Sequence, residues 1–250
     1  EFRRVLFRSQ EIERFGLMEQ LTRLVERLNL PVATSLIGKT VIPENHPNFI
    51  GNYMGRISDP HVREMVEGAD CILALGIHFS DMDTGGFSAH IVPSRVIQAT
   101  SGWIRVSHHV YPGLSLTDLV EGLLARSDLR PRPPLTLPAA DPVDVPAGPE
   151  LTMDAIFAEL NSFLQPHHLV VADVGDTLFG AGELRARWFV GAGYYASMGL
   201  AMPGAVAAQL AWPHCRPVVL VGDGAFQMNG VELSRAVDLG LDPIVVLVNN

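Results

Sequence analysis

The sequence predicts an α/β protein made of two doubly wound domains, each built on a parallel sheet. Apolar runs such as 71–76 and 217–221 show no alternation with polar residues, which is typical of parallel strands that helices cover on both faces. These runs alternate with stretches of helical periodicity, as they do in doubly wound folds. Seven prolines between 131 and 149 predict a semi-rigid linker that separates the two domains.

In the first domain, leucine and valine residues at helical spacing predict a helix over 11–28, and a short apolar run predicts a strand over 31–36. Asp59 as N-cap and Pro60 at the first helical position predict a helix over 59–68. The further elements expected in this domain are strands over 71–76 and 95–99 and a helix over 116–126.

In the second domain, a helix over 153–164 leads into a strand over 169–172 and a loop over 173–177. The elements expected after the loop are a strand over 217–221, a helix over 229–239 with Asn229 as N-cap, and a strand over 243–248. The uncharged stretch 189–212 is long enough to span a bilayer. Its alanines and glycines, together with Pro203 and Gln209, favour instead a buried helix with the loop that precedes it.

Both ends of the chain have unusual features. The segment RVLFRS at 4–9 is what the end of a common sequencing adapter encodes, so we expect 1–9 to be a non-native tail that takes no part in the fold. The chain stops at Asn250, directly after an apolar strand, so we expect a truncated second domain. The expected division is therefore a tail over 1–9, domains over 10–130 and 151–250, and a linker over 131–150.

Composition excludes several classes of function. The net charge of −9 and the pI near 5.4 argue against a nucleic-acid partner, because phosphate binding needs a basic patch. Two cysteines, Cys71 and Cys215, cannot build a disulfide framework and are expected to be buried thiols of a cytoplasmic protein. The first residues lack the apolar core of a secretory signal, and we expect no membrane partner.

The clearest chemical signal lies where two apolar strands end. The first strand runs into Gly222-Asp223-Gly224, and the strand that follows the next helix ends at Asn250. A right-handed crossover makes these strands parallel, so Asp223 and Asn250 are expected at the same edge of the sheet, where ligands bind. One carboxylate and one amide oxygen suit Mg2+ or Ca2+, and glycines allow the backbone to approach a bulky anion.

This arrangement resembles the cofactor motif of thiamine diphosphate-dependent enzymes, in which the Asp and the second Asn of the motif bind Mg2+. The resemblance covers about Gln10 to Asn250. It implies that 10–130 is a Rossmann-like middle domain and that 151–250 is the thiamine diphosphate-binding domain. Asp223 and Asn250 are then the metal ligands, and a backbone carbonyl two residues after Asn250 completes the protein's share of the site.

The resemblance assigns further cofactor-binding residues. Gly175 and Asp176 lie on the loop that approaches the diphosphate, although family members often have a hydroxyl residue in place of Asp176. Met198 is the bulky apolar residue that forces a bent cofactor, and the carbonyl of Ala196 accepts a hydrogen bond from its pyrimidine amino group. The complete set of implied cofactor-binding residues is Gly175, Asp176, Ala196, Met198, Gly222, Asp223, Gly224, Ala225 and Asn250.

Finer similarity points to the branch of 2-keto acid decarboxylases. The segments that resemble phenylpyruvate, indolepyruvate and pyruvate decarboxylases are 50–55, 80–87, 111–113, 175–176, 193–196 and 224–228. The implied reaction is non-oxidative decarboxylation of a 2-keto acid, of the phenylpyruvate or indolepyruvate type, to the aldehyde and CO2. The implied assembly is a homo-oligomer, dimer or tetramer, with the cofactor at a subunit interface.

The resemblance also implies that the acid that activates the cofactor is a Glu of an N-terminal domain supplied by a partner subunit. No catalytic residue is therefore expected within this chain, and we expect the chain alone to be inactive. Two alternatives stay open. One is an acetolactate synthase-like carboligase or another thiamine diphosphate enzyme, which shares the metal motif. The other is a non-catalytic regulatory domain that binds a nucleotide or a metal.

Overall fold

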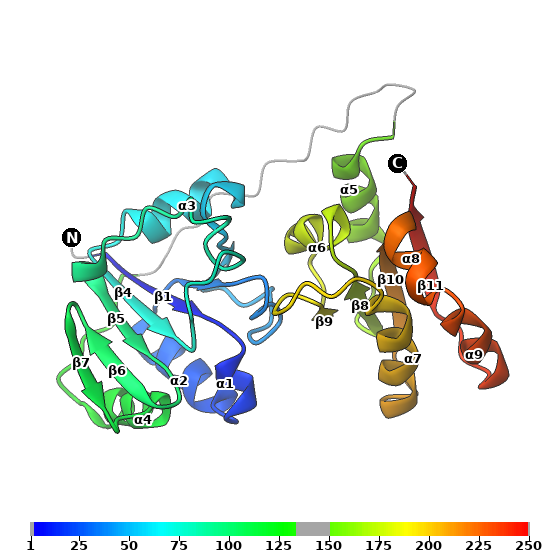
Figure 1. Ribbon diagram of the computed structural model, residues 1–250. Coiled ribbons are helices and arrows are strands. Elements are labelled where there is room, and N and C mark those ends of the chain that lie inside the picture. Colours follow the sequence, from blue (N-terminus) through cyan, green and yellow to red (C-terminus); the bar gives the residue numbers. More distant parts are fainter. Residues whose placement is uncertain (1–2, 134–150, 250) are drawn as a thin grey trace. The chain divides into compact units, whose positions relative to one another are not determined.

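The computed structural model describes residues 3–133 and 151–249 (Figure 1). The chain divides into two compact units, 1–139 and 140–250. Most of the predicted linker, 134–150, lies outside the described residues. Each unit is an α/β layer structure, so the predicted fold class is confirmed.

Unit 1 is built on a seven-stranded sheet with the order β3-β2-β1-β4-β5-β6-β7. The strands from β3 to β5 run parallel, whereas β6 and β7 are antiparallel to their neighbours and form a hairpin at one edge. The strands are β1 Arg4–Arg8, β2 Val32–Thr34, β3 Phe49–Asn52, β4 Cys71–Leu75, β5 Val96–Ala99, β6 Trp103–Val106 and β7 His109–Pro112.

Helices cover both faces of this sheet (Figure 1). They are α1 Glu11–Arg14, α2 Met18–Leu28, α3 Pro60–Glu67 and α4 Leu116–Ala125, with 3-10 turns η1 Gly55–Ile57 and η2 Pro93–Arg95. Leu6 packs with residues of α2 and α4 on one face, and Phe7 packs with residues of α3 on the other. Asp59 caps α3 as predicted, because its side chain accepts from the backbone N–H groups of His61 and Val62.

The predicted helix over 11–28 is divided into α1 and α2. The break lies at Gly16, whose φ of 68° places it in the left-handed region that interrupts a right-handed helix. The apolar face of α2 begins after this break, with Leu21, Leu24 and Val25 buried against the sheet. The helical spacing in the sequence therefore located α2 correctly but did not show that the chain turns before it.

The prediction that 1–9 takes no part in the fold is wrong. Strand β1 lies at the middle of the seven-stranded sheet, where Leu6 pairs with Val32 on one side and with Leu73 on the other. Val5, Leu6 and Phe7 are buried on the two faces of the sheet. Three successive apolar residues suffice for this position because a central parallel strand is covered on both faces. The non-native origin of the segment stays a prediction.

Unit 2 has a four-stranded, fully parallel sheet with the order β11-β10-β8-β9. The strands are β8 His168–Ala172, β9 Trp188–Gly191, β10 Arg216–Gly222 and β11 Ile244–Val248. The helices are α5 Met153–Phe163, α6 Asp176–Gly180, α7 Ala201–Ala211, α8 Asp223–Asn229 and α9 Glu232–Asp238, with a 3-10 turn η3 Ala181–Glu183.

The prediction of one helix over 229–239 capped by Asn229 is wrong. A first helix, α8, starts at Asp223 directly after β10 and ends at Asn229, and α9 begins at Glu232. Buried Ala225 anchors α8 against the sheet, so the chain becomes helical six residues earlier than its apolar spacing suggested. The Asn229 side chain does not cap a helix and instead bonds to another loop.

The uncharged stretch 189–212 contains most of β9, an exposed turn and helix α7. Helix α7 spans eleven residues and packs its alanines against β8 and β10. Within 3–133 and 151–249, no helix combines the length and apolarity needed to cross a bilayer. The stretch is therefore a strand, a turn and a helix with one buried face in an α/β unit.

Candidate functional site

The candidate site lies at the carboxyl ends of the parallel strands of unit 2. Gly222, the last residue of β10, is the register partner of Val248, the last residue of β11. The residues that follow them, Asp223 and Asn249, therefore leave the sheet side by side. The predicted parallel pairing of these strands is confirmed, whereas Asn250 lies outside the described residues.

Gly222 leaves free space where Asp223 begins α8. A Cβ added to Gly222 would meet no heavy atom within 4 Å, and its φ of −76° is open to any residue. Asp223 is half-buried in the first turn of α8, and Ala225 is buried. In the first turn of a helix the N–H groups have no intrahelical acceptor, so this corner presents backbone donors beside a carboxylate.

Strand β8 ends beside β10 and contributes the second predicted loop. Gly175 has a φ of 108°, which favours glycine, and a Cβ there would also meet no heavy atom within 4 Å. Asp176 is exposed and starts α6. The neighbouring hydroxyl of Thr177 is buried and donates to the Asp173 carbonyl at 2.8 Å, so it serves the loop itself.

The turn between β9 and α7 carries Ala196 and Met198. Ala196 has a φ of 51°, which is uncommon for a residue with a side chain, and its N–H donates to the Ala192 carbonyl at 2.9 Å. The Met198 side chain is 46% exposed, and its Cε lies 3.6 Å from the position of a Cβ on Gly224. The structure thus brings Met198 against the loop that starts α8.

Asp173, which follows β8, was not singled out in the sequence. Its carboxylate is fully buried and accepts from the N–H groups of Val174 at 2.9 Å, Gly199 at 3.0 Å and Ala201 at 2.8 Å. Its own N–H donates to the Leu220 carbonyl of β10 at 2.8 Å. Asp173 therefore joins the end of β8 to the turn that carries Met198.

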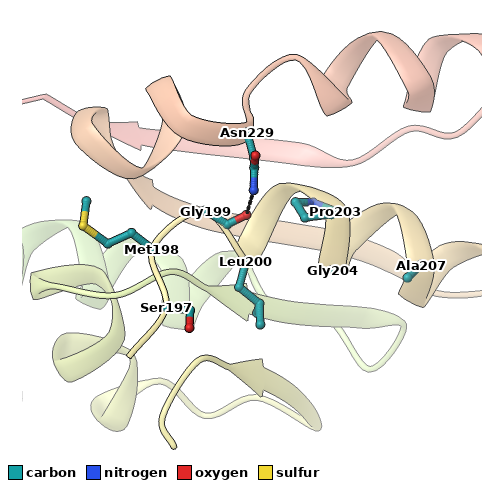
Figure 2. A pocket seen from close by; sticks show the side chains of 8 residues that line it. All are labelled: Ser197, Met198, Gly199, Leu200, Pro203, Gly204, Ala207 and Asn229. Carbon is teal, nitrogen blue, oxygen red and sulfur yellow. Dashed lines mark hydrogen bonds between the residues drawn. The ribbon is translucent and has the colours of Figure 1, made fainter. Parts of the chain in front are cut away.

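Asn229 reaches the same turn from the other side. Its Nδ2 donates to the Gly199 carbonyl at 2.9 Å, as Figure 2 shows. Both residues line an open pocket of about 440 Å3 together with Ser197, Met198, Leu200, Pro203, Gly204 and Ala207. Neither Gly222 nor Asp223 lines this pocket, so it adjoins the predicted diphosphate site without being it.

A metal ion at this edge would rely on oxygen donors. Among the described residues there is no group of three or more His, Cys, Asp or Glu side chains that could hold an ion. The predicted set differs in kind, since it combines the Asp223 carboxylate with an amide and a backbone carbonyl. Hard cations such as Mg2+ accept such sets and complete them with water and phosphate oxygens. The donor chemistry and the open space at Gly222 and Gly175 fit a Mg2+-bound diphosphate.

The structure places all but one of the predicted residues at this end of unit 2. Those placed there are Gly175, Asp176, Ala196, Met198, Gly222, Asp223, Gly224 and Ala225. Their roles toward a cofactor remain predictions.

Two family models match the chain. Residues 3–122 match "Thiamine pyrophosphate enzyme, central domain", and residues 173–250 match "Thiamine pyrophosphate enzyme, C-terminal TPP binding domain". The first match includes β1, and the second starts at Asp173 and contains all nine predicted cofactor-binding residues, Asn250 included.

Several curated proteins are similar over nearly the whole chain. An alpha-keto-acid decarboxylase of Mycolicibacterium paratuberculosis is 32% identical over 246 residues, which are 96% of this chain and 44% of that protein. A protein of the same name from Mycobacterium leprae is 34% identical over 247 residues, 96% of this chain and 43% of that protein. An indole-3-pyruvate decarboxylase of Azospirillum brasilense is 32% identical over 252 residues, 98% of this chain and 46% of that protein. The chain thus spans less than half the length of these relatives.

Proposed function

Because the chain belongs to the thiamine pyrophosphate enzyme family, whose central and C-terminal domains it carries, we propose that it forms part of a thiamine diphosphate- and Mg2+-dependent 2-keto acid decarboxylase. The observation that carries this proposal is the pairing of Gly222 with Val248, because the next residues along the two strands are Asp223 and Asn249. The names of the relatives support decarboxylation as the reaction.

In this proposal, Asp223 and Asn250 hold Mg2+ through side-chain oxygens. The ion offsets the charge of the diphosphate, which would otherwise approach the carboxylates of Asp223 and Asp176 in a protein of net charge −9. Gly222 and Gly175 leave room for the diphosphate, and the N–H of Ala225 donates to a phosphate oxygen. Bound thiamine diphosphate supplies the electron sink for cleavage of the bond between the keto carbon and the carboxylate.

In this proposal the turn over 196–199 binds the two rings of the cofactor. The carbonyl of Ala196, held in a left-handed conformation, accepts a hydrogen bond from the cofactor's pyrimidine amino group. The Met198 side chain lies beside Gly224 and is half exposed, so it is free to pack between the two rings of the cofactor. These residues bind and orient the cofactor, and in cofactor-dependent enzymes binding and orientation are what the protein supplies.

We further propose that the substrate is an aromatic 2-keto acid, such as phenylpyruvate or indolepyruvate. The support is the similarity to an indole-3-pyruvate decarboxylase and the segments 175–176, 193–196 and 224–228. The test is steady-state release of CO2 by the intact enzyme from phenylpyruvate, indolepyruvate and pyruvate. Equal or higher kcat/KM for the aromatic acids supports the proposal. A strong preference for pyruvate, or formation of acetolactate in place of an aldehyde, contradicts it.

The proposed assembly is a cytoplasmic homo-oligomer with the cofactor at a subunit interface. Tyr194 and Tyr195, on the turn of the candidate site, are 62% and 85% exposed, and a neighbouring subunit would cover such apolar surface. The acid that activates the cofactor then comes from another domain. We accordingly expect residues 1–250 alone to release no CO2 from phenylpyruvate with Mg2+ and thiamine diphosphate present. Cofactor-dependent turnover by this chain alone would contradict that assignment.

A further inference from the structure

Two side chains from different elements bond to the backbone N–H and carbonyl of Gly199. Its N–H donates to Asp173 Oδ1 at 3.0 Å. Its carbonyl accepts from Asn229 Nδ2 at 2.9 Å, the bond drawn in Figure 2. Asp173 follows β8, and Asn229 ends α8, the helix that Asp223 starts. The turn is therefore fastened both to the end of β8 and to the helix that follows the predicted metal ligand.

Only glycine suits the residue in the middle. Gly199 has a φ of 89°, and a Cβ there would lie 2.8 Å from Asn229 Nδ2. The residue before it, Met198, places its Cε 3.6 Å from the Cβ position of Gly224. A shift of the Gly199 peptide moves Met198 relative to Gly224, because the two residues are adjacent in the chain.

The Asp173 carboxylate bonds both to the turn that carries Met198 and to helix α7. It is fully buried, and its two oxygens accept from different backbone N–H groups. Oδ1 accepts from Val174 and from Gly199 of the turn, and Oδ2 accepts from Ala201 at the start of α7. Carboxylates accept stronger bonds from N–H groups than neutral oxygens do, and the N-terminus of a helix favours a negative charge. The bonds orient the turn and α7 together.

We propose that Asp173 and Asn229 are positioning residues that set the place of Met198 over Gly224 and so shape the cofactor site. The proposal rests on the proposed function, in which Met198 packs against the cofactor. Neither residue touches the cofactor in this account, and each acts through the Gly199 peptide. Both residues therefore affect cofactor affinity through Met198 and not through the metal.

The test compares variants of the intact enzyme in two measurements. The first is hydrogen exchange of the backbone amides over 194–201 in cofactor-free protein, which reports how firmly Asp173 and Asn229 hold the backbone of Gly199. The second is the Kd for thiamine diphosphate at saturating Mg2+. The variants are Asp173→Asn, which keeps the side-chain volume but replaces one acceptor oxygen with an NH2 group, together with Asn229→Ala, Met198→Ala and the double variant Asn229→Ala/Met198→Ala.

Asn161→Ala is the matched control. Asn161 also bonds to backbone groups in unit 2, with Oδ1 accepting from Arg185 N at 2.7 Å and Nδ2 donating to the Glu183 carbonyl at 3.2 Å. It contacts a different loop, so its loss leaves the turn over 194–201 and the Kd unchanged. A similar effect of Asn161→Ala on both measurements would show only general loss of stability and overturn the proposal.

We expect Asp173→Asn and Asn229→Ala to speed exchange over 194–201 and to raise the Kd about 10–100-fold, as loss of outer-shell partners does. We expect Met198→Ala to raise the Kd too, and the double variant to raise it by much less than the product of the single effects. Simple multiplication of the effects would overturn the proposal, because Asn229 would then act independently of Met198. Unchanged exchange in both single variants would also overturn it. Wild-type protein that fails to bind thiamine diphosphate would refute the proposed function. The exchange measurement would still decide whether Asp173 and Asn229 hold the turn over 194–201 in place.

Discussion

Gly222 and Val248 are register partners at the ends of two neighbouring parallel strands. This pairing brings together residues that are 26 positions apart in the sequence, at the edge of the sheet where α/β proteins bind ligands. Asp223 follows one partner, and Asn249 and Asn250 follow the other. The relationship defines where a cofactor would sit and which substitutions test for one.

A substitution at Gly222 should weaken cofactor binding without affecting the stability of the fold. A Cβ at this position meets no heavy atom within 4 Å, and its φ of −76° suits alanine, so Gly222→Ala is expected to leave thermal stability nearly unchanged. The methyl group fills space that we assign to the diphosphate, and the Kd for thiamine diphosphate should rise about tenfold or more, as when a bound group loses one good contact.

Gly122→Ala is the control for this substitution, because a Cβ there also meets no heavy atom within 4 Å and the residue lies in α4 of unit 1. It should keep the wild-type Kd. A Gly222→Ala protein that binds the cofactor as tightly as the wild type would contradict the placement of the diphosphate at Gly222.

Replacing Arg8 should stabilise unit 1. Arg8 is fully buried in β1, and its Nε, Nη1 and Nη2 have no hydrogen-bond partner among the described residues. Burial lowers the pKa of its guanidinium to about 9, so the charge is disfavoured in the folded state. Because an uncompensated buried polar group costs about 1–3 kcal/mol, Arg8→Met should raise the free energy of unfolding by a similar amount at pH 7.

The sign of the pH dependence follows from the same pKa. The unfolded chain keeps the ordinary, higher pKa of an arginine side chain, so it binds more protons than the folded chain above about pH 9. The destabilisation is therefore complete below pH 9 and is relieved as the pH rises further. Hydrogen exchange of the β1 and β4 amides measures the free energy of unfolding of unit 1. Arg23→Met, an exposed change on α2, is the control, and an Arg8→Met protein less stable than the wild type would contradict the account.

Lys39 and Glu44 form a buried ion pair in unit 1, with side chains 0% and 5% exposed. Burial lowers the pKa of Lys39, and the neighbouring Glu44 opposes that shift. Lys39→Met removes the ammonium that contacts the Glu44 carboxylate, and breaking a buried ion pair from one side costs about 3–5 kcal/mol, so this variant should destabilise unit 1.

The double variant Lys39→Met/Glu44→Leu removes both charges and should recover most of the loss, because well-packed apolar side chains replace buried pairs at little cost. Urea unfolding followed by circular dichroism compares the two proteins. A double variant as unstable as Lys39→Met alone would show that packing, and not the charge pair, determines the stability here.

The parts of the structure that follow from local pattern were predictable. Uninterrupted apolar runs located β4 and β10, and the Asp59-Pro60 pair located the start of α3. The parallel relation of β10 and β11 followed from the handedness of crossovers. These features depend on residues near one another in the chain or on a rule that holds across folds.

The remaining parts depend on distant contacts. Strand β1 is short and bounded by arginines, and its place becomes evident only when β2 and β4 offer edges on both sides. Strand β7 is exposed along its whole length, so apolar pattern could not reveal it. Asp173 bonds to Gly199 and Ala201, which are 26 and 28 residues away, and a single aspartate after a strand carries no local sign of those partners.

The most direct measurement of the central claim is the Kd for thiamine diphosphate, with and without Mg2+, in Asp223→Ala and wild-type intact enzyme. Removal of the carboxylate should weaken binding by about 100-fold or more at saturating Mg2+, since breaking a charged contact to a bound ion costs several kcal/mol. Chelation of Mg2+ should weaken the wild type greatly and Asp223→Ala little, because the variant has already lost the ion. Asp238→Ala, an exposed change on α9, should keep wild-type affinity. An unchanged Kd in Asp223→Ala, or equal sensitivity of both proteins to chelation, would contradict a metal-held diphosphate at the ends of β10 and β11.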